Sequence, residues 1–388
     1  MVQFAQHSPD APGTLPEWLQ RQAADHGTRL ALRHKHLGVW QVRTWQQLAD
    51  EVRRLASALQ LRGFTEANTL VVLSRPRPEA LIAALAAQWL GGVAVLFDPL
   101  QGGAAQVELL RELNPGYFFA EGAEELAQVG AANLNAALLF YADGRGLAAE
   151  HAETALDYAV LVARAADPAL KLKARTERSA FIFYRLHEGQ HIELQRISHA
   201  ELVREGARLV QLEHLGPGEE ALAARAFAAS GQARYLLAPW LIAGFRLNFP
   251  ESLHTRDRDR DRRELGPTLV AGTRETYGRL HQEVLARLPD EGTWQRRLVD
   301  WALAAHPGVL RRVLGYWLVR RALRDILGFS RIQAPLLVGE PLAEPAQAFF
   351  AALDIRVRAW PDPARWQVAP SEPASRISGW IDDHPQLA

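Results

Sequence analysis

The chain has 388 residues, 48% of them hydrophobic, and its 44 basic side chains balance 44 acidic ones. A chain of this length buries a sizeable core, and its balanced charge excludes an overall field that attracts nucleic acid. It contains no cysteine, which excludes disulfides, thiolate metal sites and a cysteine nucleophile. The sequence shows no secretory signal and no run of about 18 apolar residues, so we expect a cytoplasmic protein.

The N-terminal part of the chain alternates between helix and strand patterns. Helical spacing of apolar residues predicts helices over Thr14–Gly27, over Trp45–Arg62 with Thr44 as its N-cap, and over Pro78–Leu90. Apolar runs predict a hairpin over Leu30–Val42 that turns near Leu37 and Gly38, and strands over Thr69–Leu73 and Gly92–Phe97. This β-α-β order implies an α/β fold, with a parallel sheet covered by helices on both faces.

The middle of the chain contains a segment with a polar centre. The Ala-rich stretch Gly122–Asp167 is expected to be mostly helical, and Asp167-Pro168 leads out of it. The segment Ser179–His199 then begins with a strand-like run over Ala180–Tyr184 and ends on Ile197-Ser198-His199, where a helix begins. Its two ends are therefore regular, and its centre is a loop.

Short motifs along the chain resemble long-chain acyl-CoA synthetases, which are AMP-forming ligases. They lie, in the same order as in that family, at Gly38-Val39-Trp40, Thr44-Trp45, Arg77-Pro78-Glu79, Gly91-Gly92, Asn248–Ser252, Gly266-Pro267-Thr268, Arg274, Asp300–Ala304 and Pro341-Leu342. The resemblance covers residues 14–357. It implies two parallel-sheet-and-helix lobes of the adenylate-forming N-terminal region, over residues 14–178 and 179–358, followed by a Pro-rich tail over 359–388.

The family resemblance makes the central loop informative. In the family, a strand leads into a Ser/Thr/Gly-rich phosphate loop that ends in Pro-Lys-Gly and is followed by Leu-Ser-His, and the segment 184–199 keeps this spacing. A loop that holds phosphate needs glycines, hydroxyls and a lysine. Here those positions hold Arg185 to Glu193, and Glu193 stands where the lysine is expected. A carboxylate repels phosphate, so the loop is degenerate.

Parts of the family's nucleotide site persist elsewhere. The adenine motif Gly-Gly-Ala-Pro corresponds to Val338-Gly339-Glu340-Pro341, where a branched side chain and a charge have been added. The segment Thr273–Gly278 keeps an arginine and an aromatic residue. The resemblance therefore gives degenerate nucleotide-site candidates and no catalytic or metal-binding residue; the candidates are Tyr184, Ser198, His199, Arg274, Tyr277, Gly339 and Pro341.

Other family features are missing from the sequence. The stretch Leu236–Phe245 is shorter than the family's region and lacks its histidine. After Val357 the family continues into Tyr-Gly-x-Thr-Glu, a ribose-binding aspartate and a C-terminal domain with the adenylation lysine. Here Trp360–Ala388 is Pro-rich and polar, and we expect it to wrap the surface or to be partly disordered. The resemblance thus implies a fold that lacks the C-terminal domain.

Two charged segments allow competing interpretations. The alternating charges of His254–Leu265 predict a solvated helix face and no nucleic-acid binding. Trp294–Gly328 combines large apolar residues with seven arginines and two aspartates. A core-packed helix pair whose arginines reach solvent is the favoured interpretation; peripheral contact with the inner face of an anionic membrane is the alternative. His187 and His191 are too weak a pattern for a metal site, and nucleophile-elbow, Walker and dinucleotide motifs are lacking.

These observations lead to three functional hypotheses. The first is an inactive homologue of an acid–thiol ligase, a pseudoenzyme that serves as a protein partner or regulator in acyl activation or lipid metabolism. The second is a residual fatty acyl-CoA ligase completed by a separate chain, and the third is an acyl or CoA binding module. No cofactor is expected, and ATP and Mg belong only to the case in which activity is retained. The first hypothesis is favoured because polar site residues have been lost while the core pattern is kept.

Overall fold

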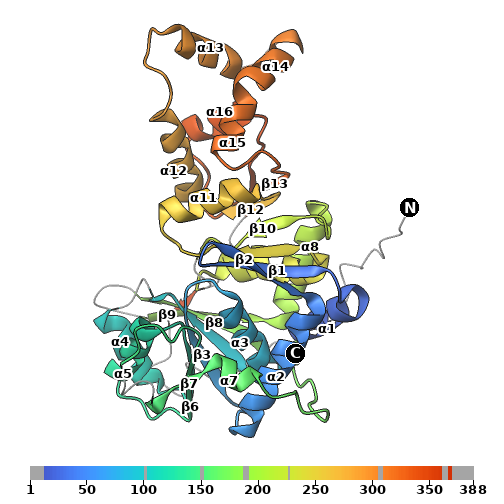
Figure 1. Ribbon diagram of the computed structural model, residues 1–388, viewed down its shortest axis with the longest axis vertical. Coiled ribbons are helices and arrows are strands. Elements are labelled where there is room, and N and C mark those ends of the chain that lie inside the picture. Colours follow the sequence, from blue (N-terminus) through green and yellow to red (C-terminus); the bar gives the residue numbers. More distant parts are fainter. Residues whose placement is uncertain are drawn as a thin grey trace. The chain divides into compact units, whose positions relative to one another are not determined.

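The computed structural model describes residues 13–99, 103–148, 153–186, 192–225, 228–304, 309–360 and 366–368 (Figure 1). The chain divides into two compact units. Unit 1 comprises residues up to Pro217, Ala223–Phe249 and the segment from Ala364; unit 2 comprises Gly218–Leu222 and Pro250–Pro363. Both units combine mostly parallel strands with helices, which confirms the predicted α/β fold class.

The larger sheet of unit 1 contains the strand of the polar segment. Within the described residues it has eight strands in the order β15-β9-β8-β4-β3-β5-β6-β7. They are β3 (Thr69–Leu73), β4 (Val93–Phe97), β5 (Tyr117–Ala120), β6 (Leu138–Tyr141), β7 (Leu156–Asp157), β8 (Ser179–Leu186), β9 (Ile192–Ser198) and β15 (Gln367–Val368). Strand β9 runs antiparallel to β8 and β15, and the other pairs are parallel.

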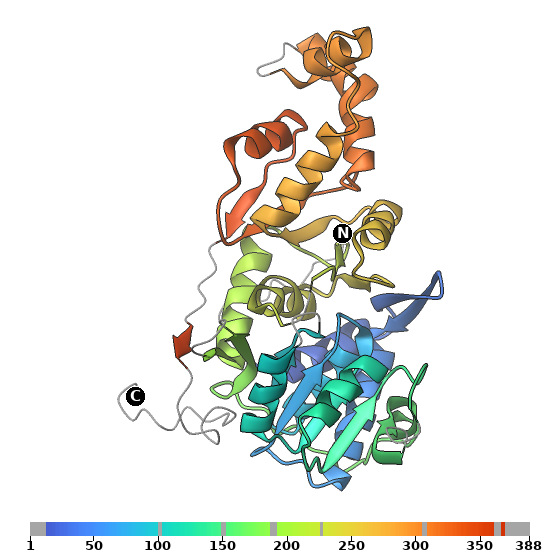
Figure 2. The ribbon, with the colours of Figure 1, turned by 90° about the vertical axis from the view of Figure 1, so that its left-hand side faces the viewer.

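Helices cover both faces of this sheet (Figure 2). The helices of unit 1 are α1 (Leu15–His26), α2 (Trp45–Leu61), α3 (Pro78–Trp89), α4 (Ala104–Leu113), α5 (Ala123–Ala131), α7 (Tyr158–Val162), α8 (His199–Leu212), α9 (Ser230–Gln232), the π-helix η2 (Ala233–Leu237) and α10 (Ala238–Ala243). Helices α4 and α5 bury side chains such as Leu110 and Val129 against Val71 and Val95. Helix α3 is buried along its whole length because it lies between the sheet and its helical neighbours.

A smaller set of strands in unit 1 confirms the predicted hairpin. Strand β1 (Leu30–His36) pairs antiparallel with β2 (Val39–Thr44) and parallel with β11 (Arg246–Phe249). Leu37 and Gly38 have φ of 50° and 77°, so the connection uses the left-handed conformation that a tight hairpin needs. Thr14 and Thr44 cap α1 and α2 through capping boxes, as the sequence predicted for Thr44.

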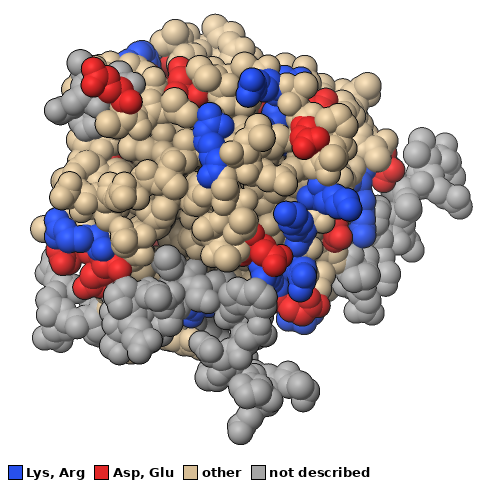
Figure 3. Space-filling model, turned by 90° about the horizontal axis from the view of Figure 1, so that it is seen from below, with Lys and Arg blue, Asp and Glu red and all other residues tan. Residues whose placement is uncertain are grey.

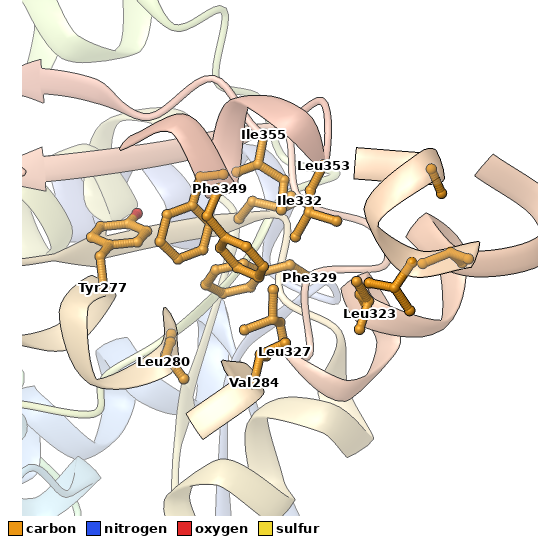
Figure 4. Close-up of a cluster of buried hydrophobic side chains, with 14 of the residues drawn as sticks. Tyr277, Leu280, Val284, Leu323, Leu327, Phe329, Ile332, Phe349, Leu353 and Ile355 are labelled. Carbon is orange, nitrogen blue, oxygen red and sulfur yellow. The ribbon is translucent and has the colours of Figure 1, made fainter. Parts of the chain in front are cut away.

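Unit 2 contains four parallel strands and a hydrophobic core. The strands β10 (Glu220–Leu222), β12 (Leu269–Gly272), β13 (Ala334–Val338) and β14 (Arg358–Trp360) run in the order β14-β13-β12-β10. The helices are α11 (Thr255–Leu265), α12 (Arg274–Leu285), α13 (Trp294–Leu303), α14 (Val309–Gly315), the π-helix η3 (Tyr316–Arg320), α15 (Arg321–Ile326) and α16 (Glu344–Ala352). Figure 4 shows its core, which includes Tyr277, Phe329 and Phe349. The Tyr277 ring also contacts the Phe350 ring.

Two expectations differ from the structure. The stretch Gly122–Asp167 is not mostly helical, because the apolar run at Leu138–Tyr141 pairs with β5 as strand β6 and Leu156–Asp157 pairs in turn as β7. Helix α11 does have the expected solvated face, where Arg256, Arg260 and Arg263 are exposed, and it buries Asp259, Asp261 and Arg262 on its other side. The two units do not follow the expected division at residue 178, because β8 pairs with β4 inside unit 1.

The tail and the surface complete the description. Of the expected tail, Arg358–Trp360 forms β14 and Gln367–Val368 pairs with β9; residues 361–365 and 369–388 lie outside the described residues. No helix in the described part of the chain is long and apolar enough to cross a membrane. On the face in Figure 3, basic side chains lie next to acidic ones in small groups, and uncharged surface separates these groups.

Candidate nucleotide site

The segment 184–199 is largely a β-hairpin. Tyr184 lies on β8 opposite Leu194, and its ring stacks on Phe97 of β4 with 5.7 Å between the centroids. Arg185 and Leu186 pair with Glu193 and Ile192 as strand residues. His187 to His191 lie outside the described residues, so the structure does not test the proposed phosphate-loop tip or the histidine pair.

Glu193, which stands where the family lysine is expected, faces a cation of its own chain. The Arg185 Nη1 lies 3.6 Å from the Glu193 Oε2 across the hairpin. The guanidinium of Arg185 also lies 4.1 Å from the ring centroid of Trp366, next to β15. At this point of the hairpin, the charge of Glu193 is therefore paired with that of Arg185.

Ser198 and His199 hold helix α8 in place. The Ser198 Oγ caps α8 by accepting the Glu201 N–H at 3.2 Å. The His199 side chain is 1% exposed, and its Nδ1 accepts the N–H of Leu15 at 3.3 Å. Burial lowers the pKa of His199 to about 3, so the imidazole is neutral. Both candidates from the Leu-Ser-His resemblance thus have structural partners.

Three further candidates, Arg274, Gly339 and Pro341, lie at the carboxyl ends of the parallel strands of unit 2. Arg274 begins α12 just after β12, and Glu340 follows β13, the neighbouring parallel strand. Their Nη1 and Oε2 atoms lie 3.0 Å apart on an exposed surface. Gly339 has a φ of 91°, a conformation that favours glycine, and it is exposed together with Pro341. The carboxyl ends of parallel strands are the edge where α/β folds bind ligands.

Tyr277 lies in the core of unit 2 rather than at this edge. Its hydroxyl donates a hydrogen bond to the Leu336 carbonyl oxygen at 3.1 Å. Its ring makes an edge-to-face contact with Phe350, with centroids 5.3 Å apart. Burial raises the pKa of Tyr277 well above its usual range, so the phenol stays protonated. It therefore cannot present its polar group to a nucleotide.

A partly buried ion network in unit 1, centred on the buried Glu79, was missed at the sequence level. Its distances are 2.8 Å for Arg43–Glu51, 3.0 Å for Arg43–Glu79, 2.8 Å for Arg77–Glu79, 2.7 Å for Arg75–Glu121 and 2.7 Å for Tyr158–Glu51. Burial alone would raise the pKa of Glu79, but the charges of Arg77 and Arg43 lower it to about 2. In the sequence, the charged residues that follow the buried strand Thr69–Leu73 were the feature from which the network could have been predicted. These paired charges connect β2 and α2 to the residues that follow β3 and β5.

Comparisons with known proteins agree with this architecture. Residues 19–184 match the model of the family described as AMP-binding enzyme. A comparison with curated protein sequences found no match. Similar solved structures include the A domain of a carboxylic acid reductase from Segniliparus rugosus in complex with AMP and a carboxylic acid, with a TM-score of 0.69 and 14% identity over 91% of this chain and 61% of that one.

Two other structures give a similar result. The adenylation domain of a carboxylate reductase from Mycobacterium chelonae has a TM-score of 0.68 and 15% identity, over 91% of this chain and 58% of that one. A luciferase-like enzyme from the mealworm Zophobas morio has a TM-score of 0.63 and 14% identity, over 91% of this chain and 72% of that one. The chain has the fold of the AMP-binding enzymes. The fold that the resemblance implied is thus confirmed, and the chain spans 58% and 61% of the length of the two reductase domains.

Two described positions of the expected nucleotide site do not fit a bound phosphate or base. Glu193 and Glu340 place carboxylates at these positions, and each already pairs with an arginine. In the part of the chain that the structure describes, no group of three or more His, Asp or Glu side chains could hold a metal ion. The centre of the loop, residues 187–191, lies outside the described residues.

Proposed function

We propose that this chain does not activate an acyl group with ATP by itself, and that it acts as a protein partner or regulator in acyl activation or lipid metabolism. The observation that carries the proposal is the pairing of Glu193 with Arg185 at the position where the family resemblance expects a phosphate-binding lysine. On this proposal the chain alone uses neither ATP nor magnesium.

The electrostatics of the hairpin support the loss of chemistry. Transfer to a phosphoryl group depends on cations and N–H donors that stabilise charge on phosphate oxygens. A phosphate placed near Glu193 would meet a carboxylate, and Arg185, the cation opposite it, is shared between Glu193 and the Trp366 ring. A phosphate would therefore have to compete with Glu193 for this arginine.

Glu340, the second acidic residue at the expected nucleotide site, also disfavours nucleotide binding. Glu340 lies within the motif that corresponds to the adenine pocket, and it engages Arg274. Val338 adds a branched side chain at the end of β13, where the family has glycine. A flat base would therefore meet side chains in place of close backbone contact.

The retained fold supports a role as a partner. His199 and Tyr277, two polar residues that the resemblance assigned to the nucleotide site, instead hold α8 to α1 and α12 to β13. Residues with these contacts maintain the fold without any bound nucleotide. A stable scaffold without a phosphate site fits a protein that acts through binding.

An activity measurement tests the proposal. The purified chain is mixed with ATP, magnesium and fatty acids of several lengths, and pyrophosphate release is measured beside an active acyl-CoA ligase. We expect no release above the rate without enzyme, and no heat on calorimetric titration with ATP. Pyrophosphate release would support the residual ligase instead, and heat with fatty acid or CoA alone would support the binding module.

The partner role is tested with the same active ligase. The chain is added in increasing amounts, and the rate of acyl-CoA formation and the mass of any complex are followed. A saturable change in rate together with a complex supports a regulatory partner. An unchanged rate across several ligases, without a complex, would contradict that part of the proposal.

A further inference from the structure

Exposed apolar side chains are concentrated on one helical segment of unit 2. Seven of the sixteen exposed large hydrophobic residues in the described part of the chain lie between residues 294 and 326. They are Trp294, Trp301, Val313, Leu314, Trp317, Leu318 and Ile326. In both ribbon views α13 and α14 stand at the end of unit 2 that is away from β12 and β13 (Figures 1 and 2).

The helix formed by α14 and η3 has two different faces. One face packs inward: a Cβ on Gly315 would lie 3.4 Å from the Ala302 Cβ of α13, and Val319 is buried. The other face carries Leu314, Trp317 and Leu318, which are 45%, 61% and 58% exposed. Core packing therefore uses only one side of this helix.

Arginines accompany the exposed tryptophans. The Arg311 guanidinium lies 5.3 Å from the Trp301 ring centroid, and the Arg321 guanidinium lies 5.0 Å from that of Trp317. Between Asp300 and Asp325 the sequence has five arginines and no acidic residue, and the structure places two of these arginines, Arg311 and Arg321, beside the exposed tryptophans. The outward face thus combines apolar side chains with positive charge.

We propose that this face binds the surface of an anionic lipid bilayer. We call it the Trp–Arg surface and define it by Trp301, Arg311, Leu314, Trp317, Leu318 and Arg321. Tryptophan rings suit the bilayer interface, arginine keeps its charge at the level of the headgroups, and basic residues are attracted to anionic lipids. The positive charge favours a lipid surface over an apolar partner. This proposal does not depend on the proposed function.

The contacts and burial of the arginines show which of them are suitable for testing the proposal. Arg320 is buried, donates to the Ala302 carbonyl oxygen at 2.9 Å and pairs with Asp354 at 3.0 Å, so it stabilises the fold. Arg311 and Arg321 lie beside exposed tryptophans and are the residues to reverse. Because the Arg311 Nε also donates to the Trp301 carbonyl oxygen at 2.6 Å, the single variant Arg321→Glu is tested beside the double variant. Arg256 and Arg263 on α11 are exposed arginines outside the surface, and they provide a control of equal charge change.

The test is co-sedimentation of the whole chain with lipid vesicles. We expect binding to phosphatidylcholine vesicles that contain about 30 mol % phosphatidylglycerol, at least about tenfold tighter than to phosphatidylcholine alone, and weakened by salt. The double variant Arg311→Glu, Arg321→Glu should lose at least about tenfold in partition coefficient. The control Arg256→Glu, Arg263→Glu should bind like the parent chain. Circular dichroism spectra show whether each variant is folded.

A second pair of substitutions separates apolar insertion from charge attraction. Trp317→Ser and Leu318→Ser should reduce partitioning while leaving the net charge unchanged. Equal binding to neutral and anionic vesicles, no binding to either, or equal loss in the control variant would overturn the proposal. So would self-association or protein binding that needs the same residues in a chain that does not sediment with vesicles.

Discussion

Arg185 and Glu193 face each other across strands β8 and β9, with 3.6 Å between a guanidinium nitrogen and a carboxylate oxygen. The family resemblance places a phosphate-binding lysine at position 193. The carboxylate at this position has a basic partner on the opposite strand. The pair makes the hairpin compatible with its own charges and unsuited to phosphate.

Restoring only the lysine should not restore nucleotide binding. In the variant Glu193→Lys the new ammonium would face Arg185, and the two like charges would repel. We expect no ATP binding by calorimetry. We also expect a loss of unfolding free energy of at most about 1 kcal/mol, because the pair is partly exposed. A chain in which residues 185–193 are rebuilt as a Gly/Ser/Thr loop ending in lysine is the matched comparison. Micromolar ATP affinity in the single variant would show that the loss is a simple electrostatic block.

His199 should stabilise the fold as a neutral acceptor. Replacing it by phenylalanine leaves the buried Leu15 N–H without its acceptor and should cost about 1–3 kcal/mol of unfolding free energy. The variant His199→Asn, whose side-chain oxygen can take the place of Nδ1, should recover part of that loss. Urea denaturation at pH 7 measures both. Equal stability of the parent chain and the phenylalanine variant would contradict the role of this hydrogen bond.

The same histidine should make stability depend on pH. The folded state keeps His199 neutral down to a pKa of about 3, whereas the unfolded chain takes up a proton near its ordinary value of 6.5. Between these values the unfolded state binds more protons, so stability falls as pH falls. From pH 7 to pH 5 the parent chain should lose about 2 kcal/mol more than His199→Asn does. Parallel pH profiles for the two proteins would rule out this contribution.

Among the residues of the ion network, Glu79 should contribute most to the free energy of unfolding. The variant Glu79→Gln leaves Arg43 and Arg77 close together without their shared carboxylate, and should cost about 3–5 kcal/mol. The control Glu108→Gln breaks an exposed pair with Arg111 and should cost less than about 1 kcal/mol. Denaturant unfolding compares the two variants. A similar small loss for both would show that the network contributes little to stability.

Two adjacent arginines, Arg320 in η3 and Arg321 at the start of α15, should differ in how strongly the same substitution lowers the free energy of unfolding. Arg320→Glu places a carboxylate near Asp354 and removes the bond to Ala302, so it should cost more than about 3 kcal/mol. Arg321→Glu alters an exposed side chain and should change stability by less than about 1 kcal/mol. Thermal and urea unfolding of the pair test this contrast. A folded, unaffected Arg320→Glu chain would mean that this residue is not part of the packed core.

Much of the fold could be predicted from local sequence patterns. The capping threonine Thr44, the buried runs of β3 and β4 and the hairpin turn at Leu37 and Gly38 each depend on near neighbours in the chain. Regular structure was also predicted at both ends of the segment 184–199. The first end lies in strand β8, and the second leads into helix α8. Local propensity and periodicity are sufficient for elements of this kind.

What could not be predicted depends on contacts between distant residues. Strand β6 forms from an Ala-rich neighbourhood because β5 is available to pair with it. The alternating charges of α11 gave no sign that Asp259 and Arg262 would be buried together. Glu193 and Arg185 are close in sequence, but their pairing depends on the hairpin register, and the Trp366 contact comes from residues far along the chain.

Pyrophosphate release by the purified chain with ATP, magnesium and fatty acid tests the central claim most directly. The pairing of Glu193 with Arg185 and of Glu340 with Arg274 predicts no release above the uncatalysed rate, at any acyl chain length. Release that depends on both fatty acid and enzyme concentration would contradict this account, because it would show that the chain activates acyl groups despite these paired carboxylates.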